Sequence, residues 1–391
     1  MSQKKPIIPA HLRGFYMSFV DIFATLDRDH LLMSLYSATS ADVERILQQP
    51  SAQTRGDVNA LMSLLSPAAE PYLEQMAQQA SSLTKQRFGH NISLFIPMYL
   101  SNLCANECDY CGFTMSNKIK RKILNKQEIQ QEIDIVKGFG LDAILLVTGE
   151  HETKVGVDYF AEVLPHMKQY FSHVSLEVQP LQTNEYKRLV NLGLDAVMLY
   201  QETYQPNTYA KHHTRGKKKD FTYRLNSPDR LGLAGVDKIG LGVLLGLDEW
   251  RLDALLMGHH LAYLENRYWR SKFSVSLPRL RPCTGGIEPK SAIPDKGLVQ
   301  LVCAFRLFSE QLEISLSTRE NSQFRNNILP LGITHMSAAS STQPGGYANP
   351  ESQLDQFEIS DKRSVEQVTQ AIKAKGYTPV FKDWEANWTA S

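Results

Sequence analysis

The chain has 391 residues, of which 42% are hydrophobic, and its 42 basic and 41 acidic residues leave a net charge of +1. A chain of this length can form one large α/β domain with an extension, or two domains. The balanced charge gives no reason to expect a nucleic acid or an anionic membrane as a partner. No apolar run approaches the ~20 residues that span a bilayer, and the N-terminus lacks the pattern of a secretory signal, so a cytoplasmic protein is expected.

Residues 1–88 are expected to form a helical extension that packs on the rest of the chain. Apolar residues recur at helical spacing in DRDHLLMSLYSA and in DVNALMSLL, and Pro50, Pro67 and Pro71 divide the segment. No cluster of polar side chains accompanies this pattern. A packing role is therefore favoured over a catalytic one.

The remainder of the chain, 89–380, alternates short β-rich runs with amphipathic stretches. The runs cover residues 93–100, 143–150, 174–179, 196–203, 238–246, 273–280, 313–320 and 332–338. Strands that alternate with helices indicate βαβ units and a parallel sheet, either open or closed. Eight repeats favour a (βα)8 barrel of the TIM type. A last helix over about 364–375 and a C-terminal tail at 381–391 complete the prediction.

Polar residues gather where five of these runs end. The groups are Thr148 to Glu150, Glu177 to Gln179, Gln201 to Thr203, Arg279 with Arg281, and Ser317 to Glu320. In a barrel, the carboxyl ends of the strands meet at one mouth, where catalytic sites lie. The groups are therefore expected to share one site, although strands also end in polar loops for structural reasons alone.

Three of the five cysteines lie close together directly after the first predicted strand. Cys104, Cys108 and Cys111 can hold three irons of a [4Fe–4S] cluster and leave the fourth iron open to a small molecule. A zinc site is the competing interpretation, but structural zinc usually takes four ligands and no second cysteine pair exists. Cys303 lies in an amphipathic stretch and is expected to be buried, whereas Cys283 lies in a polar loop and could approach the site.

The spacing CxxxCxxC, with Tyr110 directly before the last cysteine, resembles the signature of the radical S-adenosylmethionine superfamily. The resemblance implies a [4Fe–4S] cluster and S-adenosylmethionine as cofactors, with Tyr110 beside the adenine. The pair Gly149 and Glu150 resembles the Gly-Glu motif that binds the methionine amino group in that superfamily. Arg224 would meet the methionine carboxylate. Glu177 and Glu202 could accept hydrogen bonds from the cofactor, or serve as structural partners.

Nearly the whole chain is similar to the tyrosine-cleaving lyases of that superfamily, above all to the 2-iminoacetate synthases of thiamine biosynthesis. The strings that carry this similarity are the cysteine loop, AILLVTGEHE, SLEVQPL, MLYQETY, FTYRL, SVSLPRLRP and ISLSTRE. The resemblance implies cleavage of L-tyrosine to 2-iminoacetate and p-cresol. Related tryptophan lyases and hydrogenase-maturation tyrosine lyases are the alternatives, and a carrier of iron–sulfur clusters is the non-enzymatic one. The hydrogenase-maturation relatives have a further cysteine-containing domain, which this sequence does not show.

A free amino acid needs a cation for its carboxylate, and a planar guanidinium suits that task. Arg319, at the end of the seventh predicted strand, is the candidate, and Ser317 could donate a hydrogen bond to the same substrate. A salt bridge with Glu320 is the structural alternative for Arg319. Arg279 and Arg281, after the sixth strand, are further substrate-binding candidates.

The basic segment 211–219, which includes His212 and His213, is expected to be a solvated and mobile loop, with a lid or a docking surface as the alternative. The resemblance further implies an external reductant such as flavodoxin or ferredoxin. Because an imine hydrolyses in water, it also implies thiazole synthase as the protein that receives the product. Neither a nucleic acid nor a membrane is expected as a partner.

Overall fold

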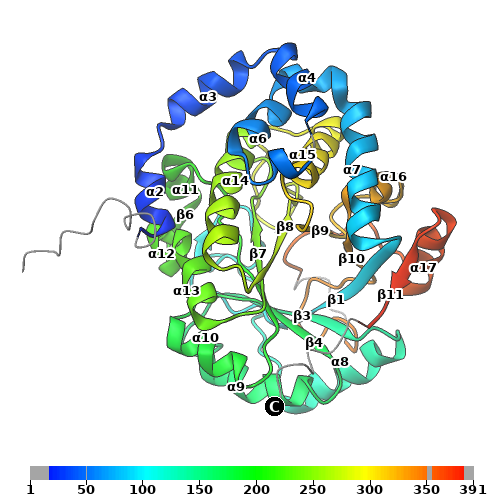
Figure 1. Ribbon diagram of the computed structural model, residues 1–391. Coiled ribbons are helices and arrows are strands. Elements are labelled where there is room, and N and C mark those ends of the chain that lie inside the picture. The colour runs from blue at the N-terminus through cyan, green and yellow to red at the C-terminus, as the bar shows by residue number, and fades with distance from the viewer. Residues whose placement is uncertain (1–16, 50, 350–354, 383–391) are drawn as a thin grey trace, which may run out of the picture.

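The computed structural model describes residues 17–49, 51–349 and 355–382, and its centre is a closed barrel of eight parallel strands (Figure 1). In order around the barrel, the strands are β1 (Asn91–Ser101), β3 (Ala143–Thr148), β4 (His173–Glu177), β5 (Ala196–Met198), β7 (Lys238–Gly242), β8 (Lys272–Ser276), β9 (Glu313–Leu316) and β10 (His335–Ser337). β10 pairs with β1 and closes the ring. The predicted (βα)8 fold is confirmed.

Helices follow each of these strands and cover the outside of the barrel. They are α8 (Lys126–Gly138), α9 (Val157–Met167), α10 (Thr183–Val190), α13 (Ser227–Ala234), α14 (Trp250–Arg267), α15 (Asp295–Phe308), α16 (Ser322–Gly332) and α17 (Val365–Ala374). Two short helices, α11 (Pro206–His212) and α12 (Phe221–Leu225), lie between β5 and α13. The predicted last helix thus corresponds to α17.

The strands form because their residues alternate between two environments. In β1, Phe95 and Tyr99 face the barrel interior, whereas the intervening residues join the main hydrophobic core: Ile92, Leu94, Ile96, Met98 and Leu100. Side chains along a strand point to opposite faces in turn, so this pattern places one set against the helices and the other inside the barrel. The interior set decides how much space the barrel encloses.

Small side chains occupy much of the interior. Six serines of the barrel strands line its cavities: Ser93, Ser175, Ser274, Ser276, Ser315 and Ser337. Bulky branched residues usually fill this layer of a TIM barrel. Because serine is small, the barrel remains hollow from its middle to its carboxyl-terminal mouth, which leaves room for ligands.

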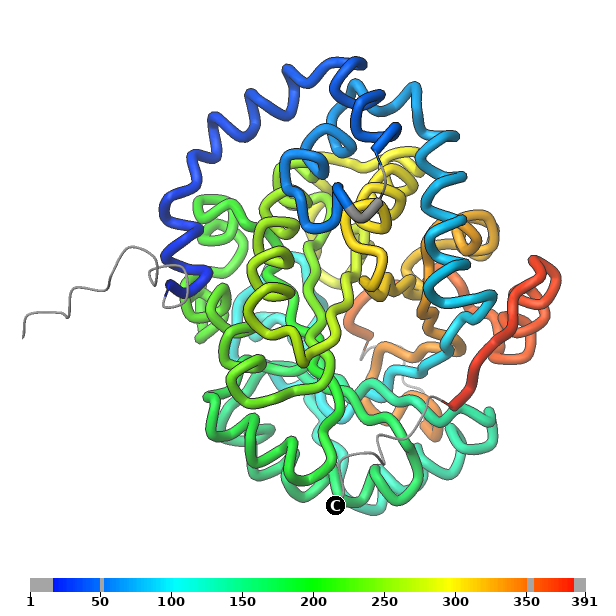
Figure 2. The backbone as a smooth tube through the Cα atoms, in the orientation of Figure 1, coloured from blue at the N-terminus to red at the C-terminus, as the bar shows by residue number. Residues whose placement is uncertain are grey.

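Helices that precede β1 pack on one side of the barrel (Figure 2). They are α2 (Phe19–Thr25), α3 (Arg28–Ser37), α4 (Ser40–Gln48), α5 (Ser51–Thr54), α6 (Val58–Leu65) and α7 (Leu73–Phe88), with the 3-10 helix η2 (Pro67–Tyr72) between the last two. α6 packs against α14 and α15, and α7 packs against α15 and α16. Residues 1–16 of the expected extension lie outside the described residues.

A ninth parallel strand, β11 (Thr378–Val380), pairs with the first residues of β1. The backbone N–H of Asp142 also donates to the carbonyl of Phe381, so the end of the chain contacts the strand beside β1. The sequence pattern did not predict this strand. Of the expected tail at 381–391, residues 383–391 lie outside the described residues.

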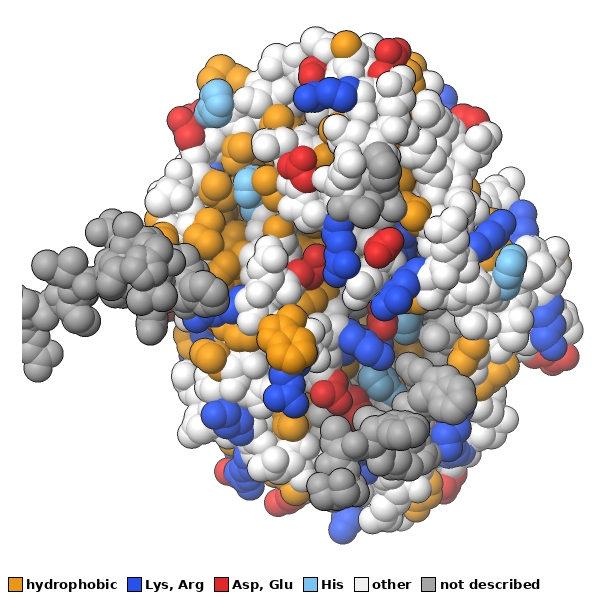
Figure 3. Space-filling model, viewed as in Figure 1, with side chains coloured by type: hydrophobic (Ala, Val, Ile, Leu, Met, Phe, Trp, Pro, Cys, Tyr) orange, Lys and Arg blue, Asp and Glu red, His pale blue; other side chains and the backbone are white. Residues whose placement is uncertain are grey.

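Basic and acidic side chains are interspersed over the face seen in Figure 3, which shows no large area of a single sign among the described residues. None of the helices in the described part of the chain is both long enough and apolar enough to span a bilayer.

Candidate active site

The carboxyl-terminal mouth of the barrel contains a cavity of about 170 Å³. Eleven of the predicted site residues line it: Cys104, Cys108, Tyr110, Cys111, Gly149, Glu150, Glu177, Glu202, Arg224, Ser317 and Arg319. They come from the loop after β1 and from the ends of β3, β4, β5 and β9, with Arg224 from α12. The topology therefore brings together residues that are more than 200 positions apart in the chain.

The loop that carries the three cysteines is held by its own backbone and by one arginine. The N–H of Cys108 donates to the Thr114 hydroxyl at 2.9 Å, and the N–H of Thr114 donates to the carbonyl of Cys111 at 3.0 Å. The Arg121 guanidinium donates to four loop carbonyls, those of Asn102, Phe113, Thr114 and Asn117. These bonds fix the turn that directs three sulfurs toward the cavity.

Gly149 is required by the close approach of β3 to the cysteine loop. Its N–H donates to the carbonyl of Ser101 at 2.9 Å, and a Cβ atom at this position would overlap the carbonyl oxygen of Leu103. The next carbonyl, that of Glu150, accepts the N–H of Ala105 at 2.9 Å. The Gly-Glu pair therefore joins the second barrel strand to the cysteine loop and places the Glu150 side chain beside it.

Two acids and two bases form a buried network next to the cysteines. Arg224 donates to Glu150 at 2.9 Å, and Lys218 donates to Glu202 at 2.7 Å. Asn106 donates its amide to the other oxygen of Glu150 at 2.7 Å. Burial alone would raise the pKa of Glu150, but the charges of Arg224 and Lys218 hold it below its ordinary value. The network is ionised and neutral overall.

Glu202 is held in a strained backbone conformation. Its φ of 71° lies in the left-handed region, which costs a non-glycine residue about 1–3 kcal/mol. The strand that continues from β5 forms an isolated bridge between Glu202 and Val243, and the N–H of Leu244 donates to the Glu202 carbonyl at 2.8 Å. The surrounding bonds therefore fix the direction of this carboxylate toward the cavity.

The segment 211–219 is not the solvated loop that the sequence favoured. Its strand β6 (His213–Arg215) pairs antiparallel with β2 (Glu107–Cys108) of the cysteine loop, and His212 and His213 are both buried. The His213 Nδ1 atom faces the carbonyl of Tyr209, so Nε2 accepts the hydrogen of the Tyr110 hydroxyl at 2.6 Å. Burial lowers the pKa of His213 to about 2, so the ring is neutral. The expectation of an irregular, solvated loop was wrong for the two histidines, because strand pairing and ring packing bury them, whereas Lys211, Arg215 and Lys219 remain exposed.

Arg279 and Arg281 do not line the cavity. Arg279 pairs with Glu320 and, at 2.7 Å, with Asp295, so its guanidinium is already committed. This arrangement also removes Glu320 as a partner for Arg319. The two arginines after β8 therefore lie outside the cavity, whereas Arg319 after β9 lines it. All three follow the end of a strand, so the sequence position alone does not distinguish them.

Arg319 and Glu177 both line the cavity, and neither has an ion-pair partner among the residues that the structure describes. The Arg319 guanidinium stacks on the Phe357 ring, with its central carbon 3.5 Å from the ring centroid, and forms no hydrogen bond or ion pair with the residues described. The Glu177 carboxylate likewise forms none with the described part of the chain. Burial raises the pKa of Glu177 to about 7, although the charge of Arg319 opposes the rise. An unpaired cation and an unpaired acid thus share one enclosed space.

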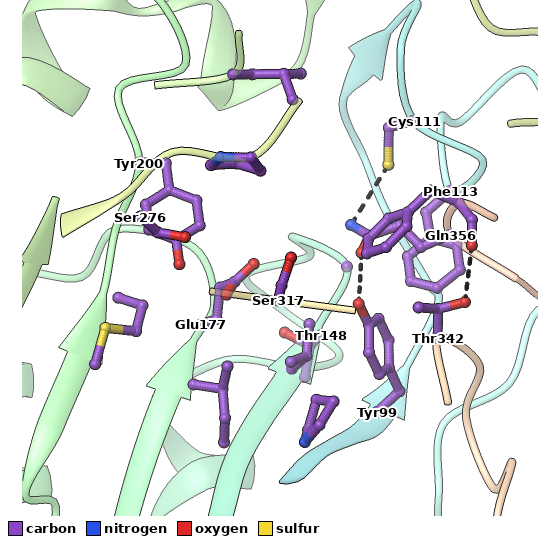
Figure 4. Close-up of a pocket in the computed structure, with 18 of the residues that line it drawn as sticks. Tyr99, Cys111, Phe113, Thr148, Glu177, Tyr200, Ser276, Ser317, Thr342 and Gln356 are labelled. Atoms are coloured by element: carbon purple, nitrogen blue, oxygen red, sulfur yellow. Dashed lines mark hydrogen bonds between the residues drawn. The ribbon is translucent and has the colours of Figure 1, made fainter. Parts of the chain in front are cut away.

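Sequence reasoning missed several residues of the site. Lys218 was hidden in a basic segment, and Tyr99 looked like an ordinary strand aromatic. Gln356 belongs to a segment that crosses from β10 to α17; Figure 4 shows it between Cys111 and Tyr99. Of these residues, only Lys218 had a signal in the sequence, which was the basic run 211–219 itself.

The thiols and the surrounding polar atoms fit an iron–sulfur cluster with a polar ligand. Burial raises the pKa of Cys104 to about 11, so binding of a metal cluster would displace protons from the cysteines. No three His, Cys, Asp or Glu side chains among the residues described converge on a single metal ion. A cubane makes no such demand, since each thiolate would bind a different iron. The Thr148 hydroxyl, which lines the cavity, is buried and lacks a partner within the described structure.

A parallel barrel with three free cysteines at its carboxyl-terminal mouth defines the class of the radical S-adenosylmethionine barrel proteins. The sequence model described as the Radical SAM superfamily matches residues 98–257, and that of the Biotin and Thiamin Synthesis associated domain matches residues 276–378. Membership of the superfamily implies a [4Fe–4S] cluster and S-adenosylmethionine.

The similarity extends to individual relatives. The 2-iminoacetate synthase of Escherichia coli (strain K12) is 53% identical over 370 residues, which cover 94% of this chain and 97% of that protein. The 2-iminoacetate synthase of Salmonella typhimurium is 52% identical over the same shares. The chain belongs to the family of the 2-iminoacetate synthases. A crystal structure of HydG, a maturase of the [FeFe]-hydrogenase, is 30% identical with a TM-score of 0.88, and covers 92% of this chain and 81% of that one.

Proposed function

We propose that this protein cleaves the Cα–Cβ bond of L-tyrosine to 2-iminoacetate and p-cresol, and so supplies the thiazole moiety of thiamine. The family relationship over nearly the full chain supports the reaction. The observation that carries the proposal is the shared cavity. Three cysteine thiols line one part of it, and another part is lined by a guanidinium and a carboxyl group that have no ion-pair partner among the described residues. A substrate held by those two groups would lie within reach of the cofactors.

Cys104, Cys108 and Cys111 would hold the [4Fe–4S] cluster, and the ionised network beside them would hold S-adenosylmethionine. When bound, these cofactors supply the 5′-deoxyadenosyl radical that takes a hydrogen atom from the substrate. Glu150 and Glu202 offer oxygens to the methionine ammonium or the ribose, and Lys218 and Arg224 offer N–H groups to the methionine carboxylate. Tyr110, fixed by His213, presents a ring for the adenine.

At the substrate end, Arg319 would bind the tyrosine carboxylate, and Ser317 would donate a hydrogen bond to it. The sequence assigned Glu177 to the cofactor, but its place in the same cavity as the free Arg319 supports a role at the tyrosine ammonium. A zwitterion needs one partner of each sign when it leaves water, because an unpaired buried charge is costly. Two fixed contacts also orient the amino acid for hydrogen abstraction.

The atoms of tyrosine equal those of 2-iminoacetate and p-cresol together. The hydrogen atom that the radical takes leaves in 5′-deoxyadenosine, so the 4-hydroxybenzyl fragment must gain a proton and an electron from another source to become p-cresol. The reaction thus needs electrons both to start it and to finish it, and we infer an external reductant of the flavodoxin or ferredoxin class. Thiazole synthase, which would take the imine before water hydrolyses it, is the inferred partner.

Anaerobic incubation of the reconstituted protein with dithionite, S-adenosylmethionine and each aromatic amino acid tests the proposal. Chromatography should find p-cresol, 5′-deoxyadenosine and glyoxylate, the hydrolysis product of 2-iminoacetate, with tyrosine only. Indole products from tryptophan would instead identify a tryptophan lyase. Deoxyadenosine without p-cresol from any amino acid would contradict the lyase assignment.

Two cysteine variants provide a matched pair for the cluster. Cys108 and Cys303 are both buried free thiols, but only Cys108 lines the cavity. Cys108→Ala should lose iron and deoxyadenosine formation, whereas Cys303→Ala in α15 should keep both. Zinc without colour or sulfide in the purified protein would overturn the cluster assignment.

A further inference from the structure

Gln356 connects the segment before α17 to the cysteine loop. Its side-chain nitrogen lies 3.7 Å from the Cys111 sulfur, within hydrogen-bonding range for a sulfur acceptor, and its side-chain oxygen accepts the Tyr99 hydroxyl at 2.7 Å (Figure 4). Tyr99 lies on β1 and is 4% exposed, so both ends of the amide contact fixed parts of the barrel. Among the described residues, Cys111 is the cluster cysteine whose sulfur accepts a hydrogen bond from a side-chain amide.

The chemistry at both ends sets the orientation of the amide. A thiolate that binds iron has no proton and can only accept, so the NH₂ group must face Cys111. The phenol hydroxyl of Tyr99 then donates to the oxygen at the other end. Reversal of the amide would place its oxygen against the sulfur and leave two acceptors facing each other. The orientation of Gln356 is therefore the one that a cluster-bound cysteine requires.

The backbone around Gln356 is fitted to the cysteine loop as well. The N–H of Gly112, which follows Cys111, donates to the carbonyl of Gln356 at 2.9 Å. A Cβ atom on Gly112 would lie 2.6 Å from the carbonyl oxygen of Asp355 and 2.8 Å from that of Gln356, so only glycine permits this approach. Farther along, Arg325 of α16 pairs with Asp361, and both side chains are fully buried. The segment is thus anchored at two points.

We propose that Gln356 is a positioning residue for the cluster: held by Tyr99, it donates an N–H to the Cys111 sulfur and makes the bound cluster easier to reduce. Reduction adds negative charge to the cluster and its thiolates. An N–H dipole that points at one sulfur stabilises that charge, and hydrogen bonds to sulfur are one of the properties that set the potential of such clusters. The inference rests on the proposed cluster site.

The test is a redox titration of the reconstituted holoenzyme, followed by the electron paramagnetic resonance signal of the reduced cluster. Gln356→Leu keeps the approximate size and removes the donor. At the ambient potential where half of the parent cluster is reduced, the ratio of reduced to oxidised cluster should fall about tenfold, which is ~59 mV for one electron. Tyr99→Phe keeps the ring, frees the amide oxygen, and should shift the ratio in the same direction by less.

Thr342→Val is the matched control. The Thr342 hydroxyl lies 3.1 Å from an Asp355 carboxylate oxygen and 3.1 Å from the carbonyl of Phe357, and its single hydrogen can be donated to either. It therefore braces the same segment and has no hydrogen bond to Cys111. Its midpoint potential should equal that of the parent. An equal shift in this control, or no shift in Gln356→Leu with four irons bound, would overturn the inference. If Gln356→Leu binds no cluster, the midpoint potential of Tyr99→Phe tests the inference instead, and a potential equal to that of the parent would contradict it. If the reconstituted parent protein binds no cluster, the result would contradict the proposed function itself.

Discussion

Arg319 has the property that a substrate anchor needs, because no acidic side chain in the described part of the chain pairs with its charge. Its guanidinium lies flat on Phe357, which limits its rotation. The neighbouring strand offers a contrast, because Arg279 is neutralised by Glu320 and Asp295. A ligand carboxylate is the group that would complete the first site, whereas the second has no need of one.

Replacement of Arg319 by Lys should weaken tyrosine binding by roughly ten- to a hundredfold. The ammonium keeps the charge but cannot form two parallel hydrogen bonds, and a charge-assisted bond contributes ~1.5–3 kcal/mol. The KM for tyrosine, measured by p-cresol formation, checks this expectation. Binding of S-adenosylmethionine should be nearly unchanged. An unaltered KM would mean that another group holds the carboxylate.

Glu177 predicts a pH dependence for tyrosine. Burial raises the pKa of this carboxyl to about 7, so it is ionised above pH 7 and becomes protonated as the pH falls through that value. The attraction for the substrate ammonium is lost in the protonated form. The kcat/KM for tyrosine should therefore decline below pH 7. In Glu177→Gln, kcat/KM should be low at every pH and should not show this decline. Profiles between pH 6 and 8.5 that coincide for the two proteins would remove Glu177 from the site.

The element that controls the site is the loop after β1, because three distant segments close on it. β6 pairs with its second cysteine, the end of β3 packs on its backbone through Gly149, and Gln356 reaches its third cysteine. The loop alone is too short to enclose a cluster. Its geometry depends on partners that lie as far as 245 residues away.

Gly149→Ala should disturb this contact directly. The added Cβ would push β3 away from the carbonyl of Leu103, and overpacking of this kind costs about 1–3 kcal/mol. We expect a lower Tm and a loss of bound iron. Gly138→Ala is the control, because nothing lies within 4 Å of a Cβ at that helical position. Equal iron content and Tm in the two variants would show that the strand end adapts to the methyl group.

The barrel could be predicted from the sequence because its signal is local and repeated: eight short β-rich runs alternate with amphipathic helical stretches. The cysteines could be predicted because their spacing is local as well. Lys218 and Gln356 could not, since their partners are set by the way loops fold over the mouth. Which arginine is free to bind the substrate depends on which one pairs with Glu320, and that partner is Arg279. The sequence could not show this, because both arginines follow the end of a strand.

For the whole molecule, the closed barrel raises the question of how a labile product leaves it. Direct transfer of 2-iminoacetate to thiazole synthase would avoid hydrolysis, and the exposed Lys211, Arg215 and Lys219 at the rim of the mouth offer a basic surface for it. Charge reversal of these three residues should weaken the complex while p-cresol formation continues. Thiazole yield with the two proteins mixed, compared with the yield across a dialysis membrane, measures the transfer. Equal yields would argue for free diffusion.

The long separation between Cys111 and Gln356 also has a consequence in time. Ribosomes add about 5–20 residues each second, so the cysteines leave the ribosome roughly 10–50 seconds before the glutamine 245 positions later. β1 remains unpaired on one side until β10 and β11 are made, after all the other strands of the barrel. A cluster inserted earlier would be exposed to oxygen, because β10 would not yet close the barrel and the segment of Gln356 would not yet contact Cys111. Delivery of iron and sulfide is therefore expected to follow the synthesis of β10 and of the segment that carries Gln356.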